Sequence, residues 1–396
     1  MKNGITFPLG FLAQGVEANI KKQTLDLAVI FSEVPCQTAG VFTTNRVQAA
    51  CVKANRELIG RKTRAIVINS GNANACTGLQ GEKDNRQMMT LAAECLGIKP
   101  EEVLVASTGV IGVELPMDKV ESGINKACAS LSKEGGENAA AAIMTTDTFP
   151  KTAIAEFTIG GKTVRMGGMA KGSGMIHPDM ATTLIFITTD AVISKECLQQ
   201  ALQDSANISY NMISVDGDTS TNDMALILAN CQAGNVEITA VNSPEYQIFR
   251  EALDRINISL AKSIARDGEG ATCLIEVEVS GARQDQDARQ VARTVVSSSL
   301  FKAAVFGKDA NWGRIICAVG YSGIDIDPDI VDICLGRQQV ARKGAGVDFD
   351  EEMAKQDLSE EEVKVQINLN QGEGRAVAWG CDLTYDYVKI NAAYRT

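Results

Sequence analysis

The segment 166–190 combines glycines, a proline and a hydroxyl residue in a way that could support chemistry. Glycines at 167, 168, 172 and 174 allow the backbone to approach another group closely, and Pro178 fixes one φ angle before Thr182 and an apolar strand. A threonine hydroxyl becomes a useful nucleophile only when a base removes its proton. By composition alone, Thr182 is most simply a β-branched residue that opens a buried strand.

Several other chemistries are excluded by the residues present. His177 is the only histidine, which excludes HExxH metal sites and histidine clusters. We expect it to pack or hydrogen-bond and assign it no catalytic role. The 11 cysteines include no CxxC pair, so zinc knuckles and CxxC redox sites are excluded as well. Residues 161–163 are similar to part of a phosphate loop, but Glu156 stands where its first glycine is needed. We therefore expect no metal and no bound cofactor.

Composition narrows the class of protein further. The chain has 396 residues, of which 45% are hydrophobic and 22% charged, which suits two closely packed domains or one large α/β body. Its net charge of −11 repels phosphate backbones, so nucleic acid is not an expected partner. Since no apolar run approaches the roughly 18 residues of a membrane helix, we expect no membrane association and a cytoplasmic protein.

The elements that would position these residues are strands and helices in mixed order. Short β-branched runs predict strands, alternation around Gly160 and Gly161 predicts a hairpin, and apolar spacing near 3.6 predicts amphipathic helices. The predicted strands are 64–69, 103–106 and 184–188, the hairpin is 153–166, and the helices are 83–96, 117–131 and 245–264.

This mixed order favours packed sheets with helices outside over a doubly wound parallel sheet. The acidic segment 348–362 has few large apolar residues and is predicted to be a solvated loop or an exposed helix.

Residues 171–182, with the sequence KGSGMIHPDMAT, resemble the autoprocessing signature of the ornithine acetyltransferase family, also called glutamate N-acetyltransferases. Asp179 and Thr183 replace the Asn and Met most common there. The match extends over almost the whole chain, in family order, and several long motifs in register make it specific. The further motifs are NSGNANA (69–75), STGVIG (107–112), MTTDT (144–148), SVDGDTSTND (214–223), RDGEGAT (266–272), GKDANWGR (307–314) and KINAAYRT (389–396).

The resemblance implies a self-cleaving enzyme with an αββα-like sandwich fold of the α/β class. Cleavage between Ala181 and Thr182 would give an alpha chain of residues 1–181 and a beta chain of residues 182–396, assembled as a heterotetramer of two alpha and two beta chains. Thr182 would then be a new N-terminus whose own α-amine, with a pKa of about 7.7–8.0, serves as its base.

The resemblance also assigns the remaining site residues. The Thr108 side chain and the Gly109 backbone N–H are expected to stabilise the oxyanion. A transferase acting on amino acids must hold an α-carboxylate and recognise an amine side chain, for which Lys171 supplies a cation and Glu269 an anion. The full set of expected substrate contacts is Thr145, with Thr146 as an alternative, Lys171, Thr182, Glu269, Asn391 and Thr396.

The activity implied is acetyl transfer from N-acetyl-L-ornithine to L-glutamate through an acetylated Thr182, with acetyl-CoA as a possible second substrate. Two alternatives remain open. One is an N-terminal-nucleophile amidohydrolase or aminopeptidase, in which water accepts the acyl group. The other is an uncleaved amino-acid-binding protein whose glycine-rich loop only holds a ligand.

Overall fold

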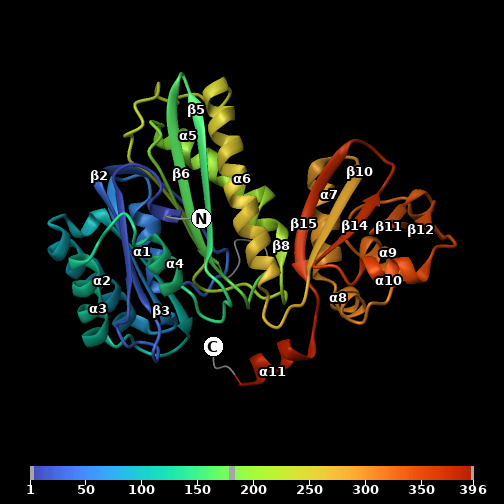
Figure 1. Ribbon diagram of the computed structural model, residues 1–396, viewed down its shortest axis with the longest axis horizontal. Helices are drawn as coiled ribbons and strands as arrows, with labels where there is room; N and C mark the ends of the chain where they lie inside the picture. Colours follow the sequence, from blue (N-terminus) through green and yellow to red (C-terminus); the bar gives the residue numbers. More distant parts are fainter. Residues whose placement is uncertain (1–3, 178–182, 394–396) are drawn as a thin grey trace.

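Two β-sheets form the body of the protein and lie side by side in Figure 1. The computed structural model describes residues 4–177 and 183–393. Within these residues, the first sheet has the strand order β4-β3-β2-β9-β7-β6-β5, with β1 paired to β2. Its strands are β1 (Phe11–Val16), β2 (Leu27–Phe42), β3 (Thr63–Asn72), β4 (Val103–Val110), β5 (Lys151–Ile159), β6 (Lys162–Lys171), β7 (Leu184–Thr189) and β9 (Met224–Ala229).

The second sheet is built from the C-terminal half, in the order β13-β12-β11-β14-β10-β15-β8. The strand β10 pairs parallel with β14 and antiparallel with β15. The strands of this sheet are β8 (Ile213–Ser214), β10 (Leu274–Ala282), β11 (Asp332–Leu335), β12 (Gln338–Arg342), β13 (Ala345–Gly346), β14 (Glu362–Asn368) and β15 (Gly374–Cys381).

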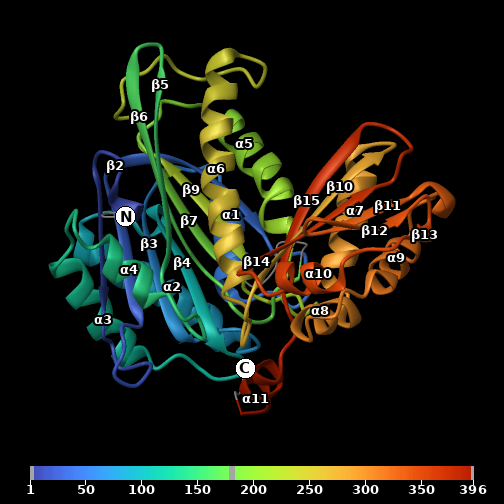
Figure 2. The same cartoon turned by 45° about the vertical axis from the view of Figure 1, so that its right-hand side comes forward.

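Helices cover both sheets, and α6 packs against both. It contacts β5 and β6 of the first sheet and β10 and β15 of the second, and Figure 2 shows it between them. The helices are α1 (Ala50–Leu58), α2 (Gly78–Leu96), α3 (Met117–Ala129), α4 (Gly136–Ala142), α5 (Lys195–Ile208), α6 (Pro244–Arg266), α7 (Asp285–Ser297), α8 (Ser299–Phe306), α9 (Trp312–Gly320), α10 (Glu351–Asp357) and α11 (Tyr385–Ala393). Single 3-10 turns occupy Gly4–Thr6, Pro100–Glu102, Tyr210–Met212 and Pro328–Ile330.

The central strand β7 is buried on both faces. Ile185 and Ile187 join the core that contains α5 and α6, whereas Leu184 and Phe186 face the core formed with β2 to β4. Side chains alternate between the faces of a strand. A strand covered on both sides therefore needs the continuous apolar run seen in this part of the sequence.

The predicted hairpin is confirmed. Strands β5 and β6 pair antiparallel from Lys151 with Ala170 to Ile159 with Lys162. Only Gly160 and Gly161 connect them, and both have positive φ, at 56° and 77°. Such a two-residue turn matches the twist of the strands and favours glycine. The hairpin delivers Lys171 to the end of β6.

The other predicted elements are confirmed with small differences. The strand predictions at 64–69, 103–106 and 184–188 fall within β3, β4 and β7, and the predicted helices correspond to α2, α3 and α6. Helix α2 starts at Gly78, earlier than predicted, since its first turn contains few apolar residues and gives no periodic signal. The two-sheet α/β class is confirmed, although α6 lies between the sheets instead of outside them.

The acidic segment 348–362 is only partly as predicted. It contains the short helix α10, but Ala354 and Leu358 are buried, and Glu362 already begins β14. The Asp357 carboxylate also accepts a hydrogen bond from Arg337 Nε at 2.8 Å. The few apolar residues of this segment therefore anchor it to the second sheet.

The first sheet interleaves strands from before and after residues 178–182. Strands β7 and β9 follow that segment, yet they lie between β2 and β6, which precede it. The predicted chain boundary at Ala181 and Thr182 falls in this segment, and both residues lie outside the described ones. Among residues 4–177 and 183–393, no helix is long and apolar enough to cross a membrane.

Candidate active site

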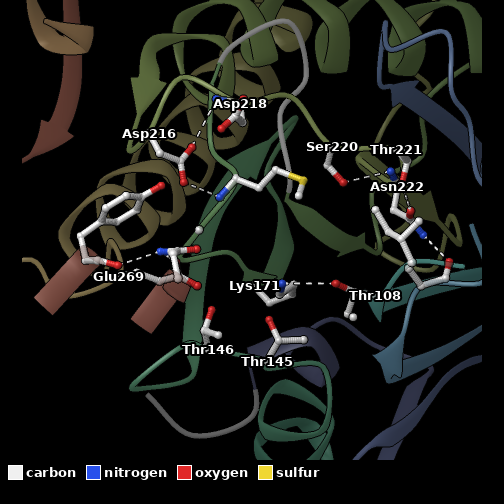
Figure 3. A pocket seen from close by; sticks show the side chains of 17 residues that line it. Thr108, Thr145, Thr146, Lys171, Asp216, Asp218, Ser220, Thr221, Asn222 and Glu269 are labelled. Carbon is white, nitrogen blue, oxygen red and sulfur yellow. Dashed lines mark hydrogen bonds between the residues drawn. The ribbon is translucent and has the colours of Figure 1, made fainter. Parts of the chain in front are cut away.

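A pocket of about 200 Å³ opens where the ends of several elements meet. Thr108 and Gly109 come from the end of β4, Lys171 ends β6, Glu269 follows α6, and Asn391 lies on α11. Figure 3 shows Thr108 on one side of Lys171, with Glu269 and Asp216 on the other. The lining residues are Ala73, Thr108, Gly109, Ile111, Thr145, Thr146, Lys171, Gly174, Met175, Asp216, Asp218, Ser220, Thr221, Asn222, Glu269, Tyr387 and Asn391.

Gly109 occupies a position that only glycine fits well. Its φ is +132°, and a Cβ there would lie 2.3 Å from the Gly71 carbonyl carbon and 2.5 Å from Asn72 N. Both contacts are to the backbone of β3, which pairs parallel with β4 and changes register beside Gly109. Because the backbones approach so closely, the end of β4 is held against a rigid neighbour.

Thr108 and Lys171 are joined by a buried hydrogen bond. Lys171 Nζ donates to Thr108 Oγ1 at 3.3 Å, and both residues are buried. Since a lysine ammonium only donates, the hydroxyl oxygen is the acceptor and its own hydrogen remains available to another acceptor. Thr108 can therefore donate to an oxyanion while it contacts Lys171.

Burial lowers the pKa of Lys171 below its ordinary value. The Asp147 carboxylate opposes this effect, and the Lys151 ammonium adds to it. Burial alone would raise the pKa of Asp147, but Lys171 and Lys151 together lower it to about 2. Asp147 is therefore ionised at neutral pH and favours the charged form of Lys171.

A buried network of ion pairs connects segments that line the pocket. Lys151 Nζ lies 2.7 Å from Asp147 Oδ1 and 2.6 Å from Asp267 Oδ2. Asp147 also accepts hydrogen bonds from the backbone N–H groups of Gly172, at 2.7 Å, and Thr145, at 3.0 Å. The network thus ties together the loop after α4, the end of β6 and the loop after α6.

Lys151, Asp147 and Asp267 are not among the site residues predicted from the sequence. Asp147 and Asp267 both lie in segments that resemble family motifs, at 144–148 and 266–272. The motifs indicate that these two segments have a functional role. They do not show that Lys151 and Asp267, which are 116 positions apart, are in contact.

Glu269 and Asn391 form the other wall of the pocket. Asn391 Nδ2 donates to Glu269 Oε2 at 2.7 Å. Glu269 also approaches the glycine-rich loop, since a Cβ on Gly174 would lie 2.4 Å from its carboxylate. This close approach explains why the loop needs a glycine at 174.

Two further groups at this wall were missed by the sequence analysis. Asp216 accepts hydrogen bonds from Met175 N at 2.6 Å and Ile176 N at 2.8 Å, and burial raises its pKa. Tyr387, on α11, lines the same wall. Asp216 lies in the motif at 214–223, whereas Tyr387 precedes the motif at 389–396 and carried no signal.

Asn222 connects the pocket to the end of β4. Its side-chain Nδ2 donates to Ala73 O at 2.6 Å and to Ser107 O at 2.8 Å. These bonds fix the loop before β9 next to Thr108. The motif at 214–223 contains Asn222, but its role in bridging the strands depends on the fold.

The remaining predicted residues divide into three groups. Thr145 and Thr146 both line the pocket, so the choice between them stays open (Figure 3). Ala181, Thr182 and Thr396 lie outside the described residues. His177 does not line this pocket, and its Nδ1 is 3.2 Å from Ser214 Oγ, which agrees with a hydrogen-bonding role.

The fold and the pocket are compatible with an enzyme that transfers acyl groups. A hydroxyl and a backbone N–H can stabilise an oxyanion, while a buried lysine and a carboxylate can hold charged ends of an amino acid. Residues 12–396 match the model of the ArgJ family. The chain belongs to the ArgJ family, and it is an acyltransferase of arginine biosynthesis.

Comparisons with individual proteins agree with this assignment. The arginine biosynthesis bifunctional protein ArgJ of Symbiobacterium thermophilum is 57% identical and covers 100% of this chain and 99% of its own length. The crystal structure of ArgJ from Bacillus halodurans is 50% identical over 53% of this chain and 98% of its own, with a TM-score of 0.52. The ornithine acetyltransferase of Mycobacterium tuberculosis, complexed with ornithine, is 40% identical over 45% of this chain and 95% of its own, with a TM-score of 0.41. The resemblance inferred from the motifs is confirmed.

Proposed function

We propose that the protein transfers an acetyl group from N-acetyl-L-ornithine to L-glutamate through an acetyl ester on Thr182. The observation that carries this proposal is the pocket, in which Thr108, Gly109, Lys171, Glu269 and Asn391 line one space of about 200 Å³. They come from segments far apart in the chain. A cation and an anion on different sides suit the α-carboxylate and side-chain ammonium of ornithine.

In the first half-reaction, the donor is bound by its two charged ends. Lys171 holds the α-carboxylate and Glu269 the side-chain ammonium. The α-amine of Thr182 takes the hydroxyl proton as Thr182 Oγ attacks the acetyl carbonyl, and the Thr108 hydroxyl and Gly109 N–H donate to the resulting oxyanion. The amide C–N bond then breaks, and the proton passes to the leaving α-amine of ornithine.

In the second half-reaction, the α-amine of glutamate attacks the acetyl ester. A new amide C–N bond forms, the ester C–O bond breaks, and the displaced Thr182 oxygen regains the proton released by the attacking amine. The same oxyanion donors serve both halves, because both pass through a tetrahedral intermediate at the same carbon.

Self-cleavage is proposed to use the same nucleophile. Thr182 Oγ attacks the Ala181 carbonyl, the acyl group shifts from nitrogen to oxygen, and water hydrolyses the ester to give residues 1–181 and 182–396. The Bacillus halodurans chain supports this idea, since nearly its full length covers 53% of this chain, close to the share of residues 182–396. We further propose two copies of each chain per assembly and a cytoplasmic location.

The first experiment is the mass of the purified protein under denaturing conditions, with N-terminal sequencing of any smaller chain. Two chains, one of which begins Thr182-Thr183-Leu184, support the proposal. A single intact chain in wild type, or cleavage at this bond in Thr182→Ala, contradicts it. An intact chain that binds amino acids without acetyl exchange would favour the binding-protein alternative.

The acceptor is then identified by assay. With labelled N-acetylornithine, transfer to glutamate yields N-acetylglutamate, whereas an amidohydrolase or aminopeptidase yields acetate at a rate independent of glutamate. Because the relatives are named bifunctional proteins, labelled acetyl-CoA is tested as a second donor in the same assay. Acetate as the main product would overturn the transferase proposal.

A further inference from the structure

On the proposed route, one pocket binds two side chains of opposite charge in turn. The side chain of N-acetylornithine ends in an ammonium group and that of glutamate in a carboxylate. The wall opposite Thr108 carries the carboxylates of Glu269, Asp216 and Asp218, as Figure 3 shows. These groups attract the ammonium and repel the acceptor's carboxylate. The acceptor therefore needs a hydrogen-bond donor at this wall.

The obvious donors are already engaged. Both side-chain N–H groups of Asn391 have partners, since Nδ2 donates to Glu269 Oε2 at 2.7 Å and to Tyr387 O at 3.0 Å. Lys171 donates to Thr108 and serves the α-carboxylate. Tyr387 also lines the pocket, and its side chain is hydrogen-bonded to Asp216. Since Asp216 also accepts from Met175 N and Ile176 N, the Tyr387 hydroxyl can turn to a bound carboxylate without leaving Asp216 unpartnered.

The position of Tyr387 is fixed by the start of α11. The Thr384 hydroxyl donates to Gly270 O at 2.8 Å and accepts from Tyr387 N at 3.3 Å. Gly270 has a φ of +72°, and a Cβ there would lie 2.6 Å from Tyr387 N. These contacts hold the backbone of Tyr387 against the loop that carries Glu269.

The charge state of Tyr387 suits a donor. Burial, followed by the Asp216 and Glu269 carboxylates, raises the pKa of Tyr387 above its ordinary value. The phenol therefore keeps its proton at neutral and moderately alkaline pH.

We propose that Tyr387 is a specificity-determining residue that admits glutamate to this acidic wall. Its hydroxyl donates a hydrogen bond to the side-chain carboxylate of the acceptor. While the donor is bound, the hydroxyl stays on Asp216, with which Tyr387 is hydrogen-bonded in the structure, and Glu269 holds the ornithine ammonium. This inference rests on the proposed function, because it assigns Tyr387 a role in only one of the two half-reactions.

The test separates the half-reactions in Tyr387→Phe. Exchange of labelled ornithine into N-acetylornithine requires only the donor step, while formation of N-acetylglutamate requires both. We expect kcat/KM for glutamate to fall about 10- to 100-fold, as for loss of a hydrogen bond to a charged group, and ornithine exchange to change less than about threefold. L-Norvaline has a methyl group in place of the side-chain carboxylate of glutamate. Its kcat/KM as an acceptor should fall no more in Tyr387→Phe than the rate of ornithine exchange does.

Tyr385→Phe is the matched control, since Tyr385 lies on the same helix and is 77% exposed. It should change neither reaction. Three results for Tyr387→Phe would overturn the role of Tyr387. These are an equal fall in the rates of ornithine exchange and glutamate transfer, an equal fall in kcat/KM for norvaline and glutamate, or no fall in kcat/KM for glutamate. A wild-type enzyme without ornithine exchange would instead contradict the proposed function, so the two failures are distinguishable.

Discussion

Thr108 and Gly109 are neighbours in β4, but they face different constraints. Thr108 contributes a hydroxyl whose oxygen accepts from Lys171 and whose hydrogen is free to donate. Gly109 contributes a backbone N–H at a positive φ, held against β3. Substitution of Thr108 should therefore lower the rate of the reaction, whereas substitution of Gly109 should lower the stability of the fold.

Thr108→Ala should lower kcat by about 10²- to 10³-fold, the usual effect of removing one oxyanion donor. Self-cleavage should slow as well, since it passes through a similar intermediate. The measurements are steady-state kinetics, the time course of chain cleavage and a thermal melt, which should be nearly unchanged. Thr90→Ala, at an exposed position of α2, is the control. A variant with normal kcat would exclude Thr108 as an oxyanion donor.

Gly109→Ala should destabilise the protein by about 3 kcal/mol or more, because it combines a strained φ with a backbone clash. Gly112→Ala is the matched control: its φ is +77°, but no atom of the described residues lies within 4 Å of the added Cβ. It should cost only about 1–2 kcal/mol from the strained φ. Denaturant unfolding of both variants measures the difference. Equal losses would mean that β3 moves away and that the close approach is unimportant.

At the scale of elements, Lys151 joins three segments that each supply a pocket residue. The segments are the loop with Thr145, the end of β6 with Lys171 and the loop with Glu269. The Lys151 side chain is completely buried, as is that of Asp147. A buried charge that loses its partner is costly, so the network should contribute to stability as well as to geometry.

Lys151→Met should therefore destabilise the protein by about 3–5 kcal/mol at neutral pH, because it leaves Asp147 and Asp267 without their shared cation. Lys162→Met, at the exposed turn end of the neighbouring strand β6, should have little effect. Denaturant unfolding of the two variants is the measurement. A small loss in Lys151→Met would show that the network does not hold these segments together.

The stability lost in Lys151→Met should depend on pH. In the wild type, the pKa of Asp147 is lowered to about 2. Its stabilising contribution is therefore present above about pH 4 and is lost as the pH falls toward 2. The difference between wild type and Lys151→Met should accordingly be largest at neutral pH and shrink below pH 4.

At the scale of the whole molecule, the first sheet should keep the two proposed chains together after self-cleavage. Strands β7 and β9 belong to the proposed beta chain and lie between β2 and β6 of the proposed alpha chain. Hydrogen-bonded ladders join β6 with β7 and β2 with β9. Separation of the two chains would require these ladders and the cores on both faces of the sheet to be broken.

The cleaved chains should therefore co-elute in size-exclusion chromatography and separate only in denaturant. Thr182→Ala, uncut under the proposal, should elute at the same volume. Native mass spectrometry of the same samples reports the number of copies of each chain. Recovery of folded, separate chains under native conditions would contradict the interleaved arrangement.

The sequence by itself determined the locally encoded features and part of the pocket lining. Gly160 and Gly161 specify a turn that spans two residues, and the apolar run at 184–188 specifies a buried strand, because both signals lie within a few neighbouring positions. The family motifs also named Thr108, Gly109, Lys171, Glu269 and Asn391, which the pocket brings together.

Only the tertiary structure decided the relations between distant residues. The contact of Lys151 with Asp267, the bridge from Asn222 to Ser107 and the wall shared by Tyr387 and Asp216 join positions more than 100 residues apart. Local periodicity carries no information about such pairs, since it reports which face of an element is apolar and not which other element covers it. These contacts exist because the sheet order, the packing of α6 and the hydrogen bond from Asn391 of α11 to Glu269 bring the segment ends to one place.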